Sequence, residues 1–172
     1  MKVELIKYPT EQDWLFCKQC TLNTIGRTTT KLPNDEWKVK LLESEHSPIR
    51  ELTFGFKLEI PYWVSVHIVR HHMGFNHYVQ SQRNDRQENY DRNKAPQDEL
   101  VSHIITMNGQ AFINFCHKRL CKQASPETRA VAMEMVRLAL ETNPEFRSIL
   151  VPNCVYRNGK CTEFYPCKSK GE

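Results

Sequence analysis

The chain has 172 residues, 40% of them hydrophobic, and a formal net charge of +4, ordinary values for one globular domain with a real core. No apolar run approaches the roughly 20 residues that a membrane span needs, and the N-terminus lacks the apolar stretch of a signal peptide. We therefore expect a single cytoplasmic domain over residues 1–172. The small positive charge suits anionic small molecules and is too weak to require a nucleic-acid partner.

The N-terminal third is predicted to contain one strand and two helices. Residues 2–8 form the strand, and Thr10 is placed to cap a helix that runs to about Thr21. Asn34 caps the next helix, which we expect to end near Pro48, because a proline disfavours helical geometry in the residue before it.

Residues 51–60 carry the clearest strand pattern, because large apolar side chains occupy every second position. This alternation predicts one buried face and one polar face. Pro61 then suits the first position of a helix that we expect to reach His71. The apolar strand positions are Leu52, Phe54, Phe56, Leu58 and Ile60.

In that helix Trp63, His67, Arg70 and His71 would share one face, since they are spaced i, i+4, i+7 and i+8. An arginine and two histidines beside a tryptophan suit a flat aromatic ligand that carries negative charge. The alternative is an ordinary helix end, where His and Arg offset the helix dipole and reach solvent. Both interpretations stay open at this point.

Residues 73–96 contain almost no apolar side chains, which is typical of a solvated loop. Arginine and tyrosine recur in it, however, and this composition can also bind phosphate and stack on a base. These residues are Tyr78, Arg83, Arg86, Tyr90 and Arg92.

From about Leu100 to Lys122 the sequence predicts one long helix with an apolar arc. Asn108 and Arg119 fall in the middle of that arc. A buried, unpaired arginine is costly, so Arg119 must meet an anion or several acceptors there. An internal salt bridge, for example to Glu127, is the structural alternative. The arc consists of Val101, Ile104, Ile105, Phe112, Phe115 and Cys116.

Ser125 and Pro126 are suited to begin a last helix as N-cap and first residue, and Asn143-Pro144 ends it. From Leu150 onward we expect a strand pair that turns at Asn158-Gly159 and covers the core.

Seven cysteines, an odd number, without a secretion signal predict thiols rather than a disulfide framework. Cys17 and Cys20 have C-x-x-C spacing with no matching second pair, so we interpret them as buried helix thiols. The spacings of Cys154, Cys161 and Cys167 fit no standard zinc pattern. We therefore expect no metal, with a metal or redox role for these three thiols as the alternative.

Taken together, these stretches resemble a flavin-dependent thymidylate synthase. That family carries an Arg-His-Arg signature after a helix and a loop that ends in Ser-x-Arg, which Arg70-His71-His72 and Ser81-Gln82-Arg83 match. Arg92 through Pro96 resembles its Arg-x-x-x-Pro element. Asn108, Asn114 and Arg119 match its long helix in register, and the similarity covers roughly residues 44–140.

Some positions depart from the family pattern. His72 stands where the family has Arg, and the gap from it to Ser81 is one residue longer. Arg50 replaces an acidic residue, and His67 replaces a Gln that touches substrate. The segment 84–91 lacks a common insertion. These positions bear on flavin contact and on substrate identity.

The resemblance implies an α/β (α+β) fold in which a small, mostly antiparallel sheet packs with long helices. It implies a homotetramer whose active sites lie between subunits. The reaction implied is reductive methylation of dUMP to dTMP, with methylenetetrahydrofolate as carbon donor, FAD as hydride carrier and NADPH as reductant.

The resemblance also implies roles for individual residues. Arg119 would be catalytic, because it would bind the uracil edge and favour ionisation of N3. The residues implied for substrate binding are His67, Arg70, Ser81, Arg83, Arg92 and Arg119. Those implied for FAD binding are Ser47, Arg70, His71, His72, Asn108 and Asn114.

Three other functions remain open from the sequence. The same fold and flavin could modify a pyrimidine nucleotide differently. The segment 78–94 could instead form a module that binds single-stranded nucleic acid. A metal site could form from histidines in and after the helix that Pro61 begins, namely His67, His71, His72 and His77.

Overall fold

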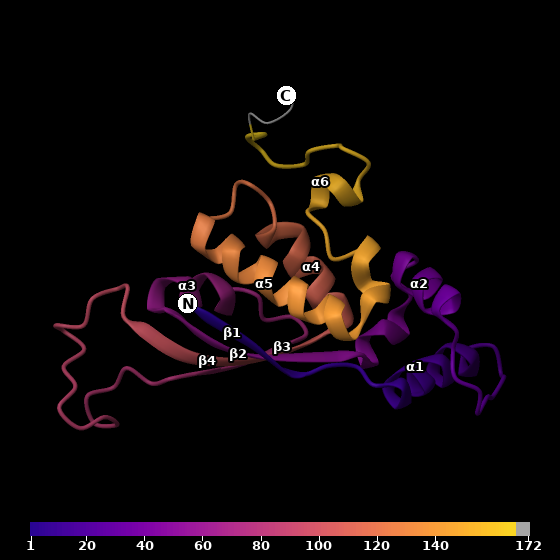
Figure 1. Cartoon of the computed structure of the whole chain (residues 1–172), viewed down its shortest axis with the longest axis horizontal. Helices are drawn as coiled ribbons and strands as arrows, with labels where there is room; N and C mark the ends of the chain where they lie inside the picture. The colour runs from indigo at the N-terminus through magenta and orange to yellow at the C-terminus, as the bar shows by residue number, and fades with distance from the viewer. Residues whose placement is uncertain (168–172) are drawn as a thin grey trace.

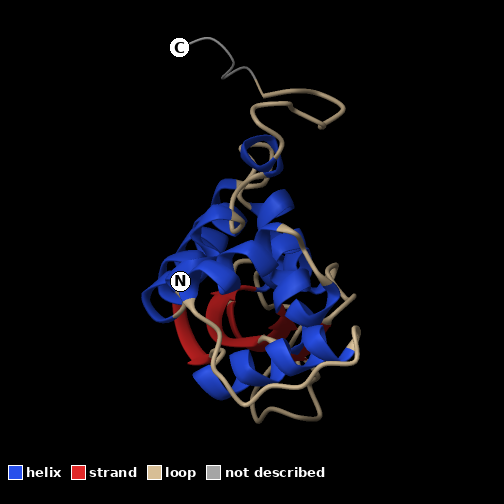
Figure 2. Ribbon diagram, turned by 90° about the vertical axis from the view of Figure 1, so that its right-hand side faces the viewer, coloured by secondary structure: helices blue, strands red, loops and turns tan. Residues whose placement is uncertain are grey.

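The computed structural model describes residues 1–167; the last part of the cysteine-containing tail, residues 168–172, lies outside the described residues. A four-stranded antiparallel sheet in the order β1-β2-β4-β3 forms one layer. Helices α3, α4 and α5 lie over one face of it, and α1 and α2 lie beyond one end (Figure 1). Figure 2 shows the strands from the end at which α1 and α2 lie. The predicted fold class, a small antiparallel sheet packed with helices, is confirmed.

The sheet combines short edge strands with two long central ones. The edge strands are β1 (Lys2–Lys7) and β3 (Phe75–Val79), and the central strands are β2 (Thr53–Pro61) and β4 (Leu100–Asn108). The predicted alternation in the second strand is confirmed, because four of its five apolar positions lie in β2 and the fifth, Leu52, directly precedes it, and all five are fully buried. The inner face of the sheet therefore supplies one wall of the core.

Both N-terminal helices begin at the predicted caps. Thr10 forms a capping box with Asp13 at the start of α1 (Glu11–Asn23), and the Asn34 side chain caps α2 (Asp35–Glu43). A 3-10 turn, η1 (Ser47–Glu51), follows with proline in its first turn. Cys17 is buried as expected, whereas Cys20 is only partly buried.

The helix after the second strand is shorter than predicted. It is α3 (Tyr62–Val69), with Pro61 as N-cap and Arg70 as C-cap. His71 therefore lies past the helix end, so the predicted shared face does not extend to it. The chain turns away there because Gly74 adopts a φ of +78°, a conformation that favours glycine, and it then enters β3.

The interval expected to be a loop contains a strand. In β3 the side chains of Phe75, His77 and Val79 are half-buried, and those of Asn76 and Tyr78 are exposed. This is the alternation of a strand with one covered face. The sequence did not reveal this alternation, because one of the covered positions is occupied by His77, which is not an apolar residue.

The long helix predicted from Leu100 to Lys122 is wrong in its first half. Residues 100–108 form β4, and only α4 (Gly109–Arg119) is helical. The Asn108 side chain accepts a hydrogen bond from the Ala111 backbone N–H at 2.9 Å and caps the helix. A Cβ on Gly109 would come within 2.7 Å of the Ile49 carbonyl oxygen, so the start of α4 is packed tightly against η1.

The C-terminal region agrees with the prediction as far as the end of its long helix. Ser125 caps α5 (Pro126–Thr142), and η2 (Pro144–Ser148) follows. The predicted strand pair in the tail is wrong: α6 (Asn153–Tyr156) forms instead, and the described tail up to residue 167 contains no strand. The predicted turn does exist, since Asn158 and Gly159 both have positive φ.

Aromatic side chains join the sheet to the helices. Phe54 of β2 contacts Phe112 of α4 and Phe146 of η2, with ring centroids 5.2 and 5.1 Å apart. Trp14 of α1 reaches the same cluster through Phe146 at 6.0 Å. All four rings are fully buried. None of the helices in the described part of the chain is long and apolar enough to cross a membrane.

Replacing Gly74 by alanine should destabilise the fold. The new Cβ would lie 2.7 Å from Asn108 Nδ2 and 2.9 Å from the Ala111 Cβ, at a φ of +78°. Steric overlap and the strained φ should together lower the free energy of unfolding by about 2–4 kcal/mol, measured by urea unfolding.

The matched control is Gly26→Ala. Gly26 has a similar φ of +67°, but no described atom lies within 4 Å of its added Cβ. It should lose only about 1 kcal/mol, from the strained φ alone. Equal losses for the two variants would show that the packing around Gly74 is looser than described.

Candidate active site

Arg119 occupies the last turn of α4 and is half-buried. Its Nε donates to Nε2 of His71 at 2.8 Å, and its Nη2 donates to the His67 carbonyl oxygen at 2.8 Å. Burial and the nearby positive charge of Arg70 lower the pKa of Arg119. Arg119 therefore donates to two neutral acceptors. This agrees with the sequence interpretation in which the buried arginine meets an anion or several acceptors.

The alternative salt bridge to Glu127 does not form. Within residues 1–167, neither Arg119 nor Arg70 takes part in an ion pair. Arg70, the C-cap of α3, is exposed, and its side chain makes no hydrogen bond to the described chain. Two guanidinium groups near each other without a carboxylate create a local positive potential that favours an anionic ligand.

The His71 ring is held in one neutral form. Because Arg119 Nε donates to its Nε2, the proton of the neutral ring must sit on Nδ1. Burial, followed by the charge of Arg119, lowers the pKa of His71 to about 4. Phe115 and Phe75 pack against the ring at 5.1 and 5.8 Å. Nδ1–H has no acceptor among the described residues, so it is available to a ligand.

His67 also lies at this site but is tied to the last long helix. Its Nδ1 lies 3.1 Å from Oγ1 of the buried Thr128, and its ring contacts Trp63 edge-on at 5.4 Å. The site thus joins α3, the end of α4 and the start of α5. This part of the predicted set, His67, Arg70, His71 and Arg119, is brought together by one chain.

A buried polar chain behind the site was not predicted. Ser65 Oγ lies 3.1 Å from His103 Nδ1, and His103 Nε2 lies 3.0 Å from His77 Nδ1. His77 Nε2 lies 2.6 Å from the His71 carbonyl oxygen. A carbonyl only accepts, so His77 must donate there. With neutral rings, His103 then donates to His77, and Ser65 donates to His103.

These hydrogen bonds hold the backbone of His71 in place from the side of the sheet. His103 is fully buried in β4, and burial together with His77 lowers its pKa to about 4. Reading residues 100–108 as a strand would have found it, because His103 falls on the same face as Val101 and Ile105. The helical interpretation hid that signal.

The histidines proposed as a metal site are engaged with different partners. His72 donates from Nδ1 to the Arg70 carbonyl oxygen at 3.2 Å, whereas His67 faces Thr128 and His77 faces His103. The four rings are thus directed at separate groups rather than at a common centre.

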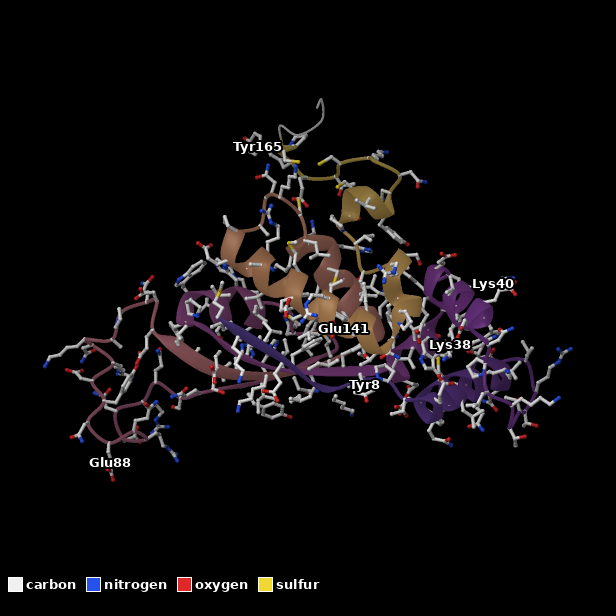
Figure 3. All side chains as sticks on the ribbon, in the orientation of Figure 1. Tyr8, Lys38, Lys40, Glu88, Glu141 and Tyr165 are labelled. Carbon is white, nitrogen blue, oxygen red and sulfur yellow. The ribbon has the colours of Figure 1, made fainter. Side chains whose placement is uncertain are left out.

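Ser81, Arg83 and Arg92 are not brought to Arg119 by the same chain. They lie on the segment between β3 and β4, which extends past the end of the sheet (Figure 1); Figure 3 marks its outer edge at Glu88. Arg83 pairs with Asp85 through bonds of 2.8 and 2.6 Å, and these bonds lower the pKa of Asp85.

Two of the other predicted cofactor residues, Ser47 and Asn108, lie near the opposite end of α4 from Arg119. Asn108 caps that helix, and its backbone N–H donates to the Gly74 carbonyl at 3.1 Å. Ser47 begins η1, which packs against the same helix start. Asn114 is exposed farther along α4 and accepts a hydrogen bond from Gln110 at 3.5 Å.

The resemblance stated from the sequence is confirmed over part of the chain. A model of the family described as thymidylate synthase complementing protein matches residues 92–145. The flavin-dependent thymidylate synthases of Sulfurisphaera tokodaii and Saccharolobus solfataricus are each 35% identical over 52 residues. Those residues are 30% of this chain and 20% of each relative, so the chain matches about a fifth of their length.

The matched stretch contains four of the predicted site residues, but the Arg70-His71-His72 signature lies outside it. Among solved structures, a UMP/dUMP methylase, PolB from Streptomyces cacaoi bound with 5-Br dUMP, has a TM-score of 0.65 and 15% identity, and covers 87% of this chain and 96% of that chain. A structure of PolB bound with 5-Br UMP has the same TM-score. These likenesses show the fold. The matched site residues are Arg92, Asn108, Asn114 and Arg119.

The stability of the protein should fall in mild acid. The pKa of His71 and of His103 is about 4 in the fold, against an ordinary 6.5. The unfolded chain therefore binds more protons between these pH values, and the free energy of unfolding decreases as pH falls from 6.5 toward 4. For His103 we expect a loss of about 3 kcal/mol, measured by urea unfolding across this window.

Two variants identify the source of that slope. His103→Asn removes the titrating ring and should make stability less dependent on pH. His46→Asn replaces an exposed histidine at the N-cap of η1 and should keep the wild-type slope. Identical slopes for wild type and His103→Asn would contradict the assigned role of the buried ring.

Proposed function

We propose that this protein is an enzyme that reductively methylates dUMP to dTMP with FAD, using methylenetetrahydrofolate as carbon donor and NADPH as reductant. The observation that carries the proposal is Arg119, which donates to the neutral His71 and lies near a second arginine, Arg70, while neither arginine forms an ion pair within residues 1–167. The family match over residues 92–145 supports it, because that stretch contains Arg119.

Arg119 is suited to stabilise negative charge on a pyrimidine ring. It is half-buried and already held by two acceptors, so little reorganisation is needed when charge develops near it. We propose that it binds the uracil edge and favours ionisation of N3, which activates the ring without an enzyme nucleophile. The thiols of Cys17 and Cys116 are buried, and burial raises their pKa, which suits packing rather than attack.

We propose that substrate phosphate is bound by the loop between β3 and β4. Ser81, Arg83 and Arg92 are exposed on it, and arginine forks match phosphate oxygens. Since this loop extends past the end of the sheet, away from α4 (Figure 1), we propose that the loop of one subunit reaches the Arg70–Arg119 site of a neighbour. We propose that the chains assemble as a homotetramer with shared sites, and the position of this loop supports such sharing.

The residues present fit FAD in their chemistry. Exposed or half-exposed polar groups lie along η1, at the start of α4 and in the turn after α3. Arg70, the C-cap of α3, precedes that turn. Such groups suit the polar and anionic parts of a flavin dinucleotide. When bound, the flavin would supply hydride transfer. The residues that would hold it are Ser47, Arg70, His71, His72, Asn108 and Asn114.

A second candidate keeps the fold and changes the substrate. The structural neighbour PolB is a UMP/dUMP methylase, and in this chain His72 and His67 depart from the family pattern. The enzyme would then methylate UMP as well as dUMP. Parallel assays with the two nucleotides separate the candidates, since the first predicts turnover of dUMP alone.

Replacing Arg119 or Arg70 by alanine should abolish most turnover. Arg119 is a preorganised donor to a developing charge, and removing such a donor costs about 100-fold or more in rate. Arg70→Ala would remove a contact to substrate and flavin. The rate is measured as dTMP formation from dUMP, methylenetetrahydrofolate and NADPH. Arg70→Ala is the safer variant for folding, because its side chain is exposed and makes no hydrogen bond within the described residues.

Arg147→Ala is the control for these variants, since Arg147 is exposed on η2, outside the site. It should keep wild-type turnover. Purified wild type should also show a flavin absorption band. A colourless protein that forms no dTMP and binds single-stranded nucleic acid would instead support the nucleic-acid alternative.

Mixing two inactive variants tests the shared site. If Arg83 from one subunit acts with Arg119 from another, tetramers reassembled from Arg83→Ala and Arg119→Ala chains contain some sites with both arginines. Random assembly should restore about a quarter of wild-type turnover. A mixture of Arg70→Ala and Arg119→Ala should restore none, because both changes lie in the same half-site. No recovery in the first mixture would rule out sharing.

A further inference from the structure

Thr128 lies behind His67 and links it to the start of α5. Its side chain is fully buried, and its Oγ1 lies 3.1 Å from Nδ1 of His67 and 2.8 Å from Oγ of Ser125. Ser125 was expected only to cap the helix, which it does by accepting the Thr128 backbone N–H at 3.4 Å. Its hydroxyl has a second task, because the same oxygen donates to the Thr128 hydroxyl.

The protons in this row of hydrogen bonds can be assigned. Ser125 donates to Thr128 Oγ1, so the single hydroxyl proton of Thr128 needs another acceptor. In residues 1–167 the structure gives Thr128 Oγ1 one further hydrogen-bonding partner, which is His67 Nδ1. A buried hydroxyl proton without an acceptor is costly, so Thr128 donates to Nδ1. In the neutral ring of His67 the proton must then sit on Nε2.

The His67 ring is held on one side and open on the other. Trp63 packs against it edge-on at 5.4 Å, and Thr128 holds Nδ1. The residue belongs to the candidate active site, since its carbonyl oxygen accepts from Arg119 at 2.8 Å. The side chain is only half-buried, and Nε2 forms no hydrogen bond within the described chain. The Nε2–H group is therefore available to a ligand.

We propose that Thr128, with Ser125 behind it, is a positioning residue that keeps His67 a hydrogen-bond donor to an acceptor oxygen of the bound nucleotide. The inference rests on the proposed function and adds to it the direction of one contact. The glutamine that the family carries in place of His67 has both a donor and an acceptor in its side chain. A histidine fixed in this form offers only the donor, so the two hydroxyls restrict what the side chain can bind.

The other groups available at the site are donors as well. They are the guanidinium groups of Arg70 and Arg119 and the Nδ1–H of His71. A ligand group that meets only donors must itself offer only acceptors. Phosphate oxygens meet this condition, and so does a uracil ring that has lost its N3 proton. A fixed donor at His67 therefore agrees with the charge expected of the ligand.

Nuclear magnetic resonance of isotope-labelled protein without ligand tests the proton assignment. At a pH of about 8, where ordinary histidines are neutral, we expect His67 to be protonated on Nε2 and unprotonated on Nδ1. Thr128→Val keeps the shape of the side chain but removes the hydroxyl, so the nitrogen shift of Nδ1 should change. Thr128→Ser should keep the wild-type shift. A proton on Nδ1 of wild-type His67 would overturn the proposal.

Binding of dUMP, measured by calorimetry, tests the consequence for the ligand. Thr128→Val should raise the Kd about 3- to 10-fold, because the ring that donates to the nucleotide is no longer held in one form. Thr128→Ser should restore most of the affinity. Thr142→Val is the matched control, since the Thr142 hydroxyl donates to the Ala139 carbonyl at 3.1 Å at the far end of α5, and it should leave the Kd unchanged.

A double-mutant cycle separates positioning from general damage to the fold. In a His67→Ala chain the Thr128→Val change should weaken dUMP binding no further, because the group that Thr128 orients is gone. Equal losses with and without the His67 ring, or a wild-type Kd for Thr128→Val, would overturn the proposal and leave the proposed function standing. A wild-type chain that binds no dUMP would overturn the proposed function and this contact together.

Discussion

The half-buried guanidinium of Arg119 is the charge around which the site is arranged. It forms no ion pair with a carboxylate of residues 1–167, so its burial is tolerated through two neutral acceptors, the His67 carbonyl and the His71 ring. Its place in the last turn of α4 also helps, because the negative end of a helix dipole favours a cation. A second arginine, Arg70, stands nearby, and the two positive charges favour an anionic ligand at this site.

The sheet side of the site serves to keep this arrangement fixed. A chain of hydrogen bonds runs from Ser65 through His103 and His77 to the His71 carbonyl oxygen, and each member donates to the next. Arg119 donates to the ring of the same residue from the helix side. His71 is therefore constrained at both its backbone and its side chain. A residue so constrained can present one ring nitrogen to a ligand without reorganising.

The sequence predicted those features that depend on neighbouring residues, namely the helix caps and the alternation of one strand. The caps at Thr10, Asn34 and Ser125 and the alternation of the second strand are as expected. The segment 100–108 was mistaken for helix because its apolar spacing fits both periods, and pairing with two neighbouring strands decides the outcome. The polar chain behind the site could not be found until that strand was known. The loop arginines lie on a segment that extends past the end of the sheet (Figure 1), and no local sequence signal predicts where such a segment lies.

The pairing of Arg83 with Asp85 has a consequence for how the loop would receive a nucleotide. Both oxygens of the carboxylate engage the guanidinium, in the two-pronged geometry that a phosphate would use. The aspartate thus acts as a stand-in for the ligand, keeping the arginine fork oriented and shielding its charge from other anions. A phosphate that binds Arg83 would then have to displace the Asp85 carboxylate, which is part of the same loop.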